Sequence, residues 1–480
     1  MTSGRPEPGR MLLATLACAG GSFALMQAII VPALSDVQRD LGASTAWVAW
    51  TVSVYLLSAA VATPLLGRLG DQFGKERMLI VTLAAFTAGS IGCILAWDIS
   101  SLIVARAVQG VSGAVYPLCF SIIRDEVPPR RVGVAMGLIS SMLGVGGGLG
   151  LVLSGPIVDH GSWRLLFVVG AVLGVVAIAL VRRHVPPSPH RAPATLDLRG
   201  ALLLSAGLVA LLVALTQGEA WGWGSGRVLG LGVAGVAALV VWGVVEARTP
   251  RPLVDMRMLA RRPVLFTNLA GLFCGFTMYA SFTVLPLFAQ MPRGLPADAR
   301  PLVDYGFDAT VTGSALLLLP GALVMLPAGP WGGVLGRRIG SRNALVLGMA
   351  VTALGAGLLA GVHEEPWQLV VAYAIGAAGV AIAFGAMPKL IADAVAPTET
   401  GVATGMNTVV RTVGSAIGAQ VAVTLLAAQT IAGTSIPAES GFTISLWLAA
   451  AAAVVAAAMA LAIEPRRAGE LSPAARSGPG

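Results

Sequence analysis

The chain has 480 residues, of which 56% are apolar and 11% are charged, whereas a soluble domain carries about 25% charged residues. This composition excludes an ordinary soluble enzyme and predicts a polytopic membrane protein. The net charge of +8 would also suit a nucleic-acid-binding protein, but the basic residues lie in small loop clusters rather than along one helix. We therefore expect membrane lipid as a partner, and no nucleic acid.

Fourteen runs are long and apolar enough to cross a bilayer, which takes about 20 residues. The predicted spans are 11–34, 46–66, 78–97, 101–123, 133–157, 163–181, 198–216, 227–245, 264–289, 310–331, 343–361, 367–388, 401–426 and 441–463. The expected fold class is an all-α polytopic membrane protein with fourteen transmembrane helices. Because the number of spans is even, both termini are expected on one side of the membrane.

The distribution of Arg and Lys selects that side. With the N-terminus placed in the cytoplasm, 24 basic residues fall in inner segments and 5 in outer ones, and two arginines, Arg106 and Arg411, lie within spans. Cytoplasmic loops of membrane proteins are enriched in Arg and Lys. The sequence therefore predicts a multi-pass protein of the cell membrane with both termini in the cytoplasm.

Two proline-containing, arginine-rich breaks follow the sixth and eighth spans, and their composition suits exposed linkers. The breaks are 182–199 and 246–263. They divide the chain into an N-terminal six-helix bundle (1–182), a linker with two extra transmembrane helices (183–263), a C-terminal six-helix bundle (264–463) and a cytoplasmic tail (464–480).

A charged, glycine-rich turn, 67–77 (GRLGDQFGKER), joins the second and third spans. Its glycines allow two helix ends to approach closely. A second copy at 333–342 repeats the glycines at a constant offset of 266 residues but carries Arg337 in the place of Asp71. A hairpin repeated in two halves is typical of transporters built from structural repeats, and the charge difference predicts that the two halves are not equivalent.

The turn at 67–77 resembles the loop motif between spans two and three of the major facilitator superfamily. Residues 106–110 (RAVQG) are similar to the R-x-x-Q-G motif of span four, and the arrangement of six, two and six spans resembles the fourteen-spanner drug:proton antiporter branch (EmrB/QacA type). The phrases 159–167, 196–223 and 401–418 are similar to that branch as well.

This resemblance implies a major facilitator fold with pseudo-symmetric halves. It implies a secondary active exporter of small lipophilic molecules, such as drugs or antibiotics, that works by proton antiport and alternating access. The energy source would be the proton gradient, with no cofactor. The protein would be a monomer and not an enzyme.

Two departures from the branch favour an alternative. Met26 and Gln27 stand where span one usually carries an acid, and Leu151 stands where the span-five motif has a proline. Both favour a dedicated metabolite or antibiotic exporter with weak or no proton coupling. A third class, an intramembrane enzyme or receptor, would need clustered His, Asp or Glu within the spans. The sequence has no such cluster, so we expect no catalytic and no metal-binding residues.

The resemblance assigns a gating role to the turn. Asp71 would cap the N-terminus of span thirteen near Thr400 and Gly401, while Arg77 would pair with Asp125 below span four. A carboxylate at a helix N-terminus is favourable by about 0.3–1 kcal/mol, and by up to about 2 kcal/mol when partly buried. The alternative is that these charges only fix loop topology. The gating set comprises Gly67, Arg68, Gly70, Asp71, Gly74, Lys75, Arg77 and Asp125.

Two further sets come from spans four and five. Arg106, with Gln109 and Gly110, is expected to couple ion and substrate movement, since a charge in the membrane costs several kcal/mol unless it is paired or solvated. Its alternative is snorkelling to the outer headgroups. In span five the glycine run is expected to form a hinge surface that Pro156 ends or kinks, or else simply a tight helix contact. The hinge set is Gly146, Gly150, Gly155 and Pro156.

The predicted substrate cavity combines aromatic and polar side chains, a pattern that suits lipophilic cations or neutral drugs. Arg411 would bind an anionic substrate group or hold a polar network with Gln420, or else make a structural bond between helices. For each aromatic residue the alternative is ordinary helix packing. The cavity set is Gln27, Asn268, Phe276, Tyr279, Phe282, Asn407 and Arg411.

Overall fold

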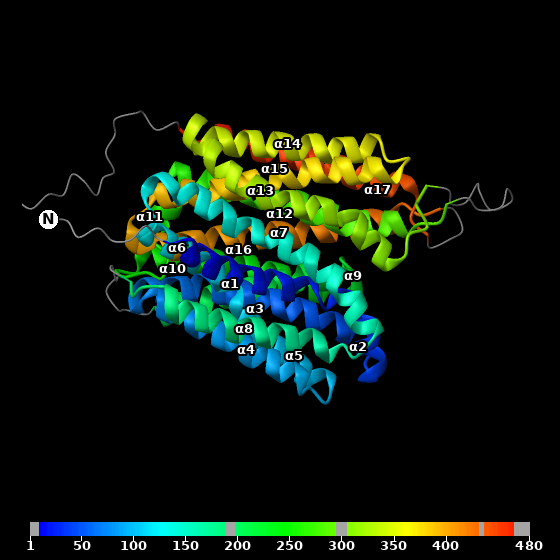
Figure 1. The fold of residues 1–480 in the computed structure, drawn as a ribbon, viewed down its shortest axis with the longest axis horizontal. Coiled ribbons are helices and arrows are strands. Elements are labelled where there is room, and N and C mark those ends of the chain that lie inside the picture. The colour runs from blue at the N-terminus through cyan, green and yellow to red at the C-terminus, as the bar shows by residue number, and fades with distance from the viewer. Residues whose placement is uncertain (1–8, 189–196, 294–304, 432–435, 465–480) are drawn as a thin grey trace, which may run out of the picture.

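A computed structural model describes residues 9–188, 197–293, 305–431 and 436–464. The long helices run side by side along one axis (Figure 1). Within the described residues, fourteen helices are long and apolar enough to cross a membrane, which confirms the predicted number of spans and the all-α fold class. The N-terminal end of the chain and parts of the first linker, the longest outer loop and the tail lie outside the described residues.

The helices in chain order are α1 (Arg10–Ala28), η1 (Val31–Ala33), α2 (Leu34–Asp40), α3 (Thr45–Phe73), α4 (Lys75–Ile94), α5 (Ile99–Gly110), η2 (Val111–Ala114), α6 (Val115–Glu126), α7 (Pro129–Asp159), α8 (Arg164–His184), α9 (Leu198–Trp221), α10 (Gly226–Arg248), α11 (Met256–Leu259), α12 (Arg262–Gln290), α13 (Val311–Ile339), α14 (Ser341–Gly361), α15 (Pro366–Ala394), η3 (Pro397–Glu399), α16 (Thr400–Ala428) and α17 (Glu439–Leu461).

Polar N-caps start several of these helices where the apolar runs begin. The side chain of each cap accepts a backbone N–H from three residues ahead, at the starts of α3, α5, α9, α10 and α13; the caps are Ser44, Asp98, Asp197, Ser225 and Thr310. Such a bond satisfies one of the four N–H groups that a helix start leaves unpaired. The exposed Asp98 carboxyl accepts from Ser101, and this hydrogen bond lowers its pKa below the usual range.

The repeated turn is shorter than the sequence suggested. α3 continues as a helix through the motif to Phe73, and α4 starts at Lys75, so that Gly74 alone turns the chain. Gly74 has a φ of 109° and its counterpart Gly340, between α13 and α14, has a φ of 88°. Both values favour glycine. The equivalent backbone at an offset of 266 residues supports the repeat that the sequence indicated.

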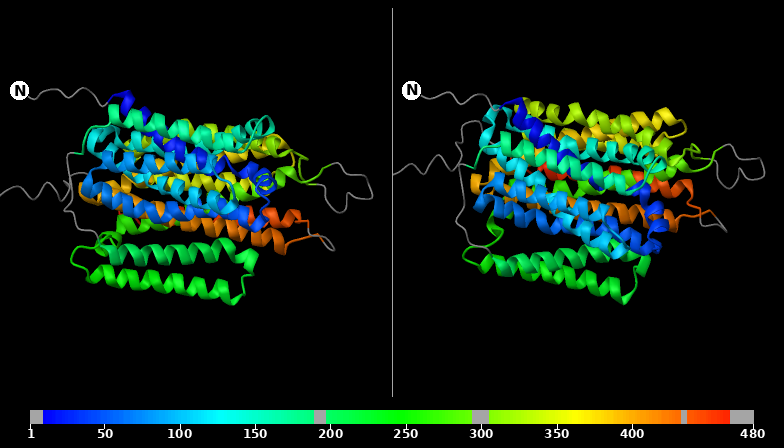
Figure 2. Two further views of the ribbon diagram at one scale, coloured as in Figure 1. Left: turned by 90° about the horizontal axis from the view of Figure 1, so that it is seen from below. Right: turned by 60° about the horizontal axis from the view of Figure 1, so that its bottom comes forward.

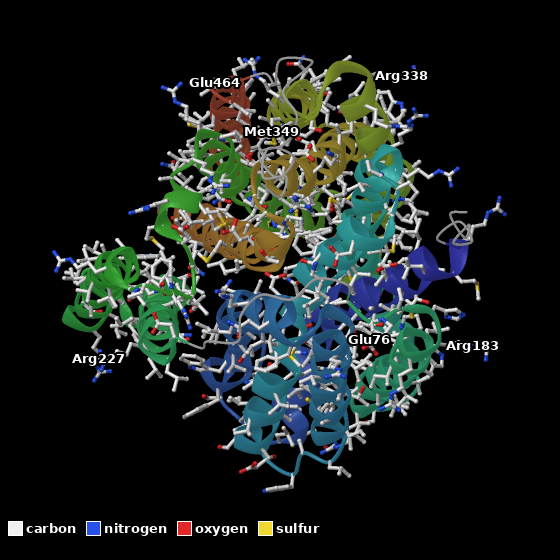
Figure 3. All side chains as sticks on the ribbon, turned by 90° about the vertical axis from the view of Figure 1, so that its left-hand side faces the viewer. Glu76, Arg183, Arg227, Arg338, Met349 and Glu464 are labelled. Carbon is white, nitrogen blue, oxygen red and sulfur yellow. The ribbon has the colours of Figure 1, made fainter. Side chains whose placement is uncertain are left out.

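We call the end of the molecule that carries Gly74 and Gly340 the motif face, and the other end the opposite face. Figure 3 looks onto the motif face, with Glu76, Arg183 and Arg338 labelled. The helices α1 and α3–α8 form one bundle and α12–α17 form another. The two bundles meet where α7 contacts α13 and α15, and where α3 and α6 contact α16.

The two extra helices, α9 and α10, form a hairpin on the outside of the paired bundles (Figure 2). α9 contacts both α3 and α16, so the hairpin lies along a seam between the bundles. Its attachment to the second bundle is apolar: Leu204 and Trp242 of the hairpin share a buried cluster with Val254 and Met258 of the following linker and with Val402 of α16.

Candidate functional site

The first copy of the turn brings the two bundles into backbone contact at the motif face. A Cβ atom added at Gly67 of α3 would lie 2.7 Å from the carbonyl oxygen of Gly401 of α16. A Cβ atom at Gly70 would lie 2.3 Å from Leu118 of α6. Both distances are shorter than real Cβ contacts; the Gly401 backbone cannot move aside, so only glycine fits at 67, whereas at 70 a larger residue would require the Leu118 side chain to shift. Gly67 thus permits the approach to the other bundle, whereas Gly70 serves packing within its own bundle.

Asp71 occupies the N-terminus of α16, the position expected from the resemblance. Its Oδ1 and Oδ2 accept the backbone N–H groups of Gly401 and Val402 at 3.4 and 3.2 Å. The side chain is 1% exposed. The carboxylate therefore satisfies two of the free N–H groups of α16 and lies at the positive end of the helix dipole.

Arg124, which is absent from the predicted gating set, is a second link between the bundles at the same face. From the last turns of α6 its guanidinium donates to the carbonyl oxygens of Val395 and Ala396 at 2.8 and 3.0 Å, and to Thr400 Oγ1. These groups end α15 and start α16. In the sequence Arg124 is one of several basic residues in 124–131, and basic residues of such a loop are explained by membrane topology. Its contacts with the other bundle depend on how the two bundles pack, which the sequence of α6 does not show.

The expected pair of Arg77 with Asp125 is wrong. The partner of Asp125 is Lys75, whose Nζ lies 2.6 Å from Asp125 Oδ2, with the two side chains 1% and 4% exposed. Arg77 is exposed. Lys75 is the first residue of α4, and Arg77, two residues farther on, points roughly 200° around the helix. The same start is anchored by Ser188, whose Oγ accepts the Lys75 N–H at 2.7 Å.

Arg106 is fully buried inside the first bundle, so the snorkelling alternative is wrong. Its Nε donates to Thr51 O at 3.0 Å, and its Nη1 donates to Met26 O at 3.3 Å and to Gln109 Oε1 at 2.6 Å. The guanidinium also lies 4.2 Å from the centre of the Tyr55 ring. Backbone carbonyls and an amide thus take the place of a carboxylate partner.

The other two residues of the motif fix this arginine in place. Gln109 Nε2 donates to Ser90 Oγ of α4 at 2.7 Å. A Cβ atom added at Gly110 would lie 2.4 Å from Tyr55 O, so α5 and α3 cross in close contact. Gln27, which stands where span one usually carries an acid, donates its amide to the hydroxyl of Tyr279 in α12 of the other bundle.

The glycine run of α7 packs on two sides. Added Cβ atoms at Gly146 and Gly150 would meet backbone atoms of α1 at 3.0 and 2.7 Å, whereas one at Gly148 would meet Ala322 of α13 at 2.4 Å. α7 therefore joins both bundles, as tight packing predicts. Gly155 has ordinary space beside Thr312. Pro156 does not end the helix, which continues to Asp159.

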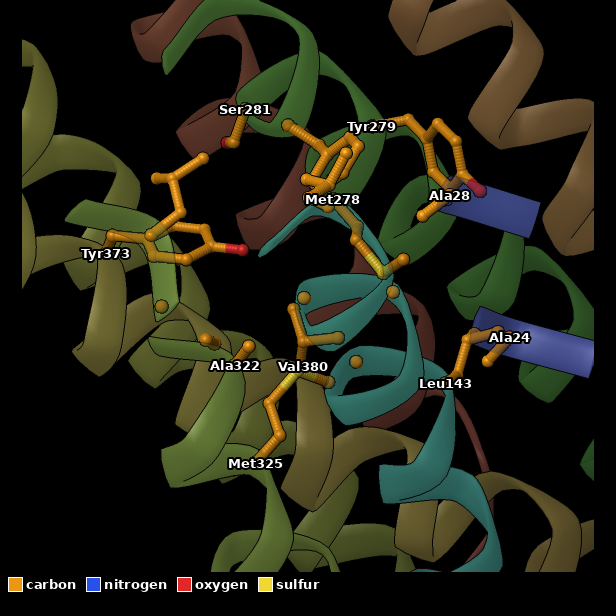
Figure 4. A pocket seen from close by; sticks show the side chains of 18 of the residues that line it. Ala24, Ala28, Leu143, Met278, Tyr279, Ser281, Ala322, Met325, Tyr373 and Val380 are labelled. Atoms are coloured by element: carbon orange, nitrogen blue, oxygen red, sulfur yellow. The ribbon is translucent and has the colours of Figure 1, made fainter. Parts of the chain in front are cut away.

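Two cavities lie between the bundles away from the motif face. The first, here called the apolar cavity, has a volume of about 160 Å³, and Figure 4 shows the side chains that line it. Met278 and Tyr279 of α12, Ala322 of α13 and Val380 of α15 line it together with the Tyr373 side chain. Phe282, a member of the predicted cavity set, also lines it.

The second cavity, here called the Arg411 cavity, has a volume of about 350 Å³ and lies between α3, α9 and α16. Ligand pockets measure about 300–1,000 Å³, so the Arg411 cavity is within the range for a small molecule, whereas the apolar cavity is about half of the lower limit. Gln27 and Tyr279 are among the side chains that line both cavities, and they are hydrogen-bonded to each other.

Three predicted cavity residues do not line either cavity. Asn407 Nδ2 donates to Asn268 Oδ1 at 3.0 Å, so these two side chains form a buried contact between α16 and α12. Phe276, one position round the helix from the lining residues, packs against the buried cluster of the second bundle. Whether a residue of α12 lines a cavity or packs against another helix depends on which face of α12 turns toward the cavities. The sequence does not show that face, because α12 is nearly uniformly hydrophobic.

Arg411 does line the cavity that carries its name. Its guanidinium lies 4.5 Å from the centre of the Phe384 ring. Gln420 lines the same cavity, but no hydrogen bond joins it to Arg411, and its Oε1 is buried without a partner among the described residues. The expected polar network between these two residues is therefore not formed in this structure.

Acidic residues avoid the middle of the helices. Among the described residues, every Asp and Glu lies in a loop, a short helix or a terminal turn of a long helix. The intramembrane charges that remain are the two arginines, Arg106 and Arg411. No group of three or more His, Cys, Asp or Glu side chains in the described part of the chain could hold a metal ion.

Comparisons with known proteins identify the family. The family model described as Major Facilitator Superfamily matches residues 16–419, with a further match over 299–478. The multidrug transporter protein MdtP of Bacillus subtilis is 26% identical over 419 residues, which cover 86% of this chain and 75% of that protein. The tetracenomycin C resistance and export protein of Streptomyces glaucescens is 28% identical over 433 residues, covering 89% and 77%.

Solved structures agree on the fold. The human organic anion transporter MFSD10 superimposes with a TM-score of 0.67 at 15% identity, covering 95% of this chain and all of that one. The proton:xylose symporter XylE gives a TM-score of 0.61 at 13% identity, covering 93% and 94%. The chain therefore belongs to the Major Facilitator Superfamily and is a membrane transporter rather than an enzyme.

Proposed function

We propose that this protein is a secondary active exporter of small lipophilic molecules that works by alternating access. The observation that carries the proposal is the position of two cavities between the bundles while the motif face is closed by contacts from one bundle to the other. Asp71 and Arg124 make these contacts with the start of α16. Because they join side chains of one bundle to backbone of the other, they can form and break as the bundles rock.

The substrate class and direction rest on further support. Relatives are named for multidrug transport and for antibiotic export, and the apolar lining of the cavity in Figure 4 suits lipophilic molecules. The excess of Arg and Lys in alternate loops favours a motif face in the cytoplasm of the cell, with both termini there. One copy of the chain encloses both cavities, which supports a monomer as the working unit.

For the energy source we propose the proton gradient, with no cofactor. A second candidate is an exporter with weak or no proton coupling, and one observation favours it: no described Asp or Glu lies mid-membrane. A proton carrier would then have to be a carboxylate at a helix end, such as the buried Asp71 of the motif face. Arg106 is held by uncharged groups and would position α1 against α3 rather than carry a proton.

Transport by purified protein in proteoliposomes separates these candidates. We expect a lipophilic fluorescent probe to move against its gradient when a pH gradient is imposed, and to equilibrate slowly without one. The Asp71→Asn variant should lose the gradient-dependent part of transport. Glu76→Gln, at the same turn but outside the contacts of Asp71 and Arg124 with the start of α16, here called the lock, should keep it. Transport that ignores the pH gradient would leave the second candidate, and failure to move any probe would overturn the export function.

A further inference from the structure

The charge that faces the Arg411 cavity is positive and stands alone. The lining comes from both bundles and from α9, and includes the aromatic side chains of Phe23, Tyr116, Tyr279 and Phe384. Among the described lining residues of this cavity and of the apolar cavity there is no Asp or Glu. A cationic molecule in this space would therefore face a like charge with no compensating carboxylate.

The guanidinium of Arg411 has no ionic or hydrogen-bonding partner among the described residues; its one contact of note is the Phe384 ring. Arg106 makes the contrast, because three hydrogen bonds and the Tyr55 ring hold that side chain. An arginine cannot lose its proton in a protein, and an uncompensated charge at membrane depth is costly. Arg106 therefore has the environment of an arginine that holds helices together, whereas Arg411 has the environment of an arginine that is free to bind a ligand.

The hydroxyl groups that α16 contributes to the cavity cannot supply hydrogen bonds to an acceptor as readily. The hydroxyls of Thr408, Thr412 and Ser415 donate to carbonyl oxygens of their own helix at 3.0, 2.9 and 2.9 Å. Their oxygens remain available as acceptors, and Gln420 Oε1 is a buried acceptor without a partner. Arg411 is thus the charged donor of the cavity, and the neutral donors beside it are the Tyr279 hydroxyl, which accepts from Gln27, and the Gln420 amide.

Building on the proposed export function, we propose that Arg411 binds an acidic group of the transported molecule. The preferred substrates are lipophilic organic acids: one carboxylate on an apolar, aromatic body that also carries hydrogen-bond donors. The planar guanidinium binds a carboxylate through two parallel hydrogen bonds. The Phe384 ring beside it and the volume of about 350 Å³ suit a body of a few fused rings.

Binding of three matched probes to the purified protein tests this inference. The probes are 1-pyrenebutyrate, its methyl ester and a pyrenylbutyl-trimethylammonium salt, which share an aromatic body and differ in charge. Energy transfer from the ten tryptophans of the chain reports binding. We expect the wild-type protein to bind the carboxylate at least tenfold more tightly than the ester or the ammonium compound.

The variants locate the preference. Arg411→Gln should lose at least tenfold in affinity for the carboxylate and keep its affinity for the ester, and Arg411→Lys should retain part of the preference. Arg39→Gln removes the same charge from an exposed side chain of α2 and should change nothing. If Arg411→Gln loses ester binding too, the variant has lost the binding site as a whole, and the proposal is then judged by the order of the three affinities in the wild-type protein.

Failures of the two proposals are distinguishable. If the wild-type protein binds the ammonium compound or the ester as well as the carboxylate, or if Arg411→Gln keeps the full preference for the acid, the assignment of Arg411 is overturned while export of lipophilic molecules stands. If proteoliposomes transport none of the three probes and the protein binds none, the proposed export function itself fails.

Discussion

The two copies of the glycine-rich turn share a backbone and differ in what surrounds it. Gly74 and Gly340 turn the chain with positive φ in both. Gly67 meets Gly401 at the start of α16, and its counterpart Gly333 meets Gly133 at the start of α7, where an added Cβ atom would lie 2.3 Å from the Gly133 carbonyl. In each copy, then, a helix of one bundle contacts the first turns of a helix in the other.

The charges at the two contacts are opposite in sign. In the first copy the Asp71 carboxylate fills the N-terminus of α16. In the second copy Arg337 takes its place, and a cavity of about 580 Å³, also lined by Arg342 and Lys389, opens at the motif face. The difference indicates that the glycine pairs set how closely the bundles approach each other. The side chain four residues after Gly67 or Gly333 then determines whether a hydrogen-bonded cap holds the two helices together.

The largest effect should come from the buried ion pair of the first copy. Replacing Lys75 by Met leaves the Asp125 carboxylate buried without its partner, which typically costs about 3–5 kcal/mol. The equivalent position of the second copy holds Ser341, which makes no ion pair among the described residues, and Ser341→Ala should cost less than about 0.5 kcal/mol. Thermal unfolding of the purified protein in detergent measures both.

A double substitution checks the cause. Lys75→Met with Asp125→Leu removes both charges and should recover most of the lost stability, because replacing a whole buried pair by apolar groups is often close to neutral. If the double variant is as unstable as the single one, packing rather than charge explains the loss.

A smaller effect is expected from the second link between the bundles. Arg124→Ala removes the charged hydrogen bonds to Val395 and Ala396; because Arg124 is only half-buried and water can replace part of these bonds, we expect a total loss of about 1.5–3 kcal/mol, the value of one such bond. The motif face should open more often, which the labelling rate of Thr408→Cys in a cysteine-free background measures from that face. Arg130→Ala, an exposed arginine at the start of α7, is the matched control and should leave the rate unchanged.

Loss of the cap should shift the same equilibrium by somewhat less. Asp71→Ala removes the two bonds to the start of α16 and should cost about 0.5–2 kcal/mol, which corresponds to a roughly two- to thirty-fold faster labelling of the same cysteine. Arg337→Ala in the second copy has no such bond to remove. Equal rates for the two variants would contradict the view that the lock resides in the first copy.

The smallest effect tests whether a lock can be installed. Arg337→Asp places a carboxylate near the start of α7, which has no side-chain cap, and should stabilise the closed motif face by about 0.3–1 kcal/mol. The expected result is slower labelling of the same cysteine from the motif face. Faster labelling would show that the open cavity of the second copy rejects a negative charge.

Much of the architecture could be predicted from the sequence, since fourteen long apolar runs and a repeat with a constant offset determine the helices and their pairing. The contact of Asp71 with the start of α16 followed from the resemblance. The partner of Asp125 did not, because Lys75 and Arg77 are both basic, and the choice depends on the residue at which α4 begins. Asn268 and Phe276 were misplaced since a helix that is apolar all round does not show which face turns inward.

The glycine run of α7 has one further consequence, which concerns how such a protein can change its substrate range. Most of these glycines are fixed by close neighbours, but an added Cβ atom at Gly147 would meet nothing within 4 Å, and Gly147 lines the apolar cavity. Larger residues at this position would reduce the space for substrate without disturbing the contact between bundles. A single codon could thus retune the size limit of the transporter, which makes position 147 a natural starting point for directed evolution.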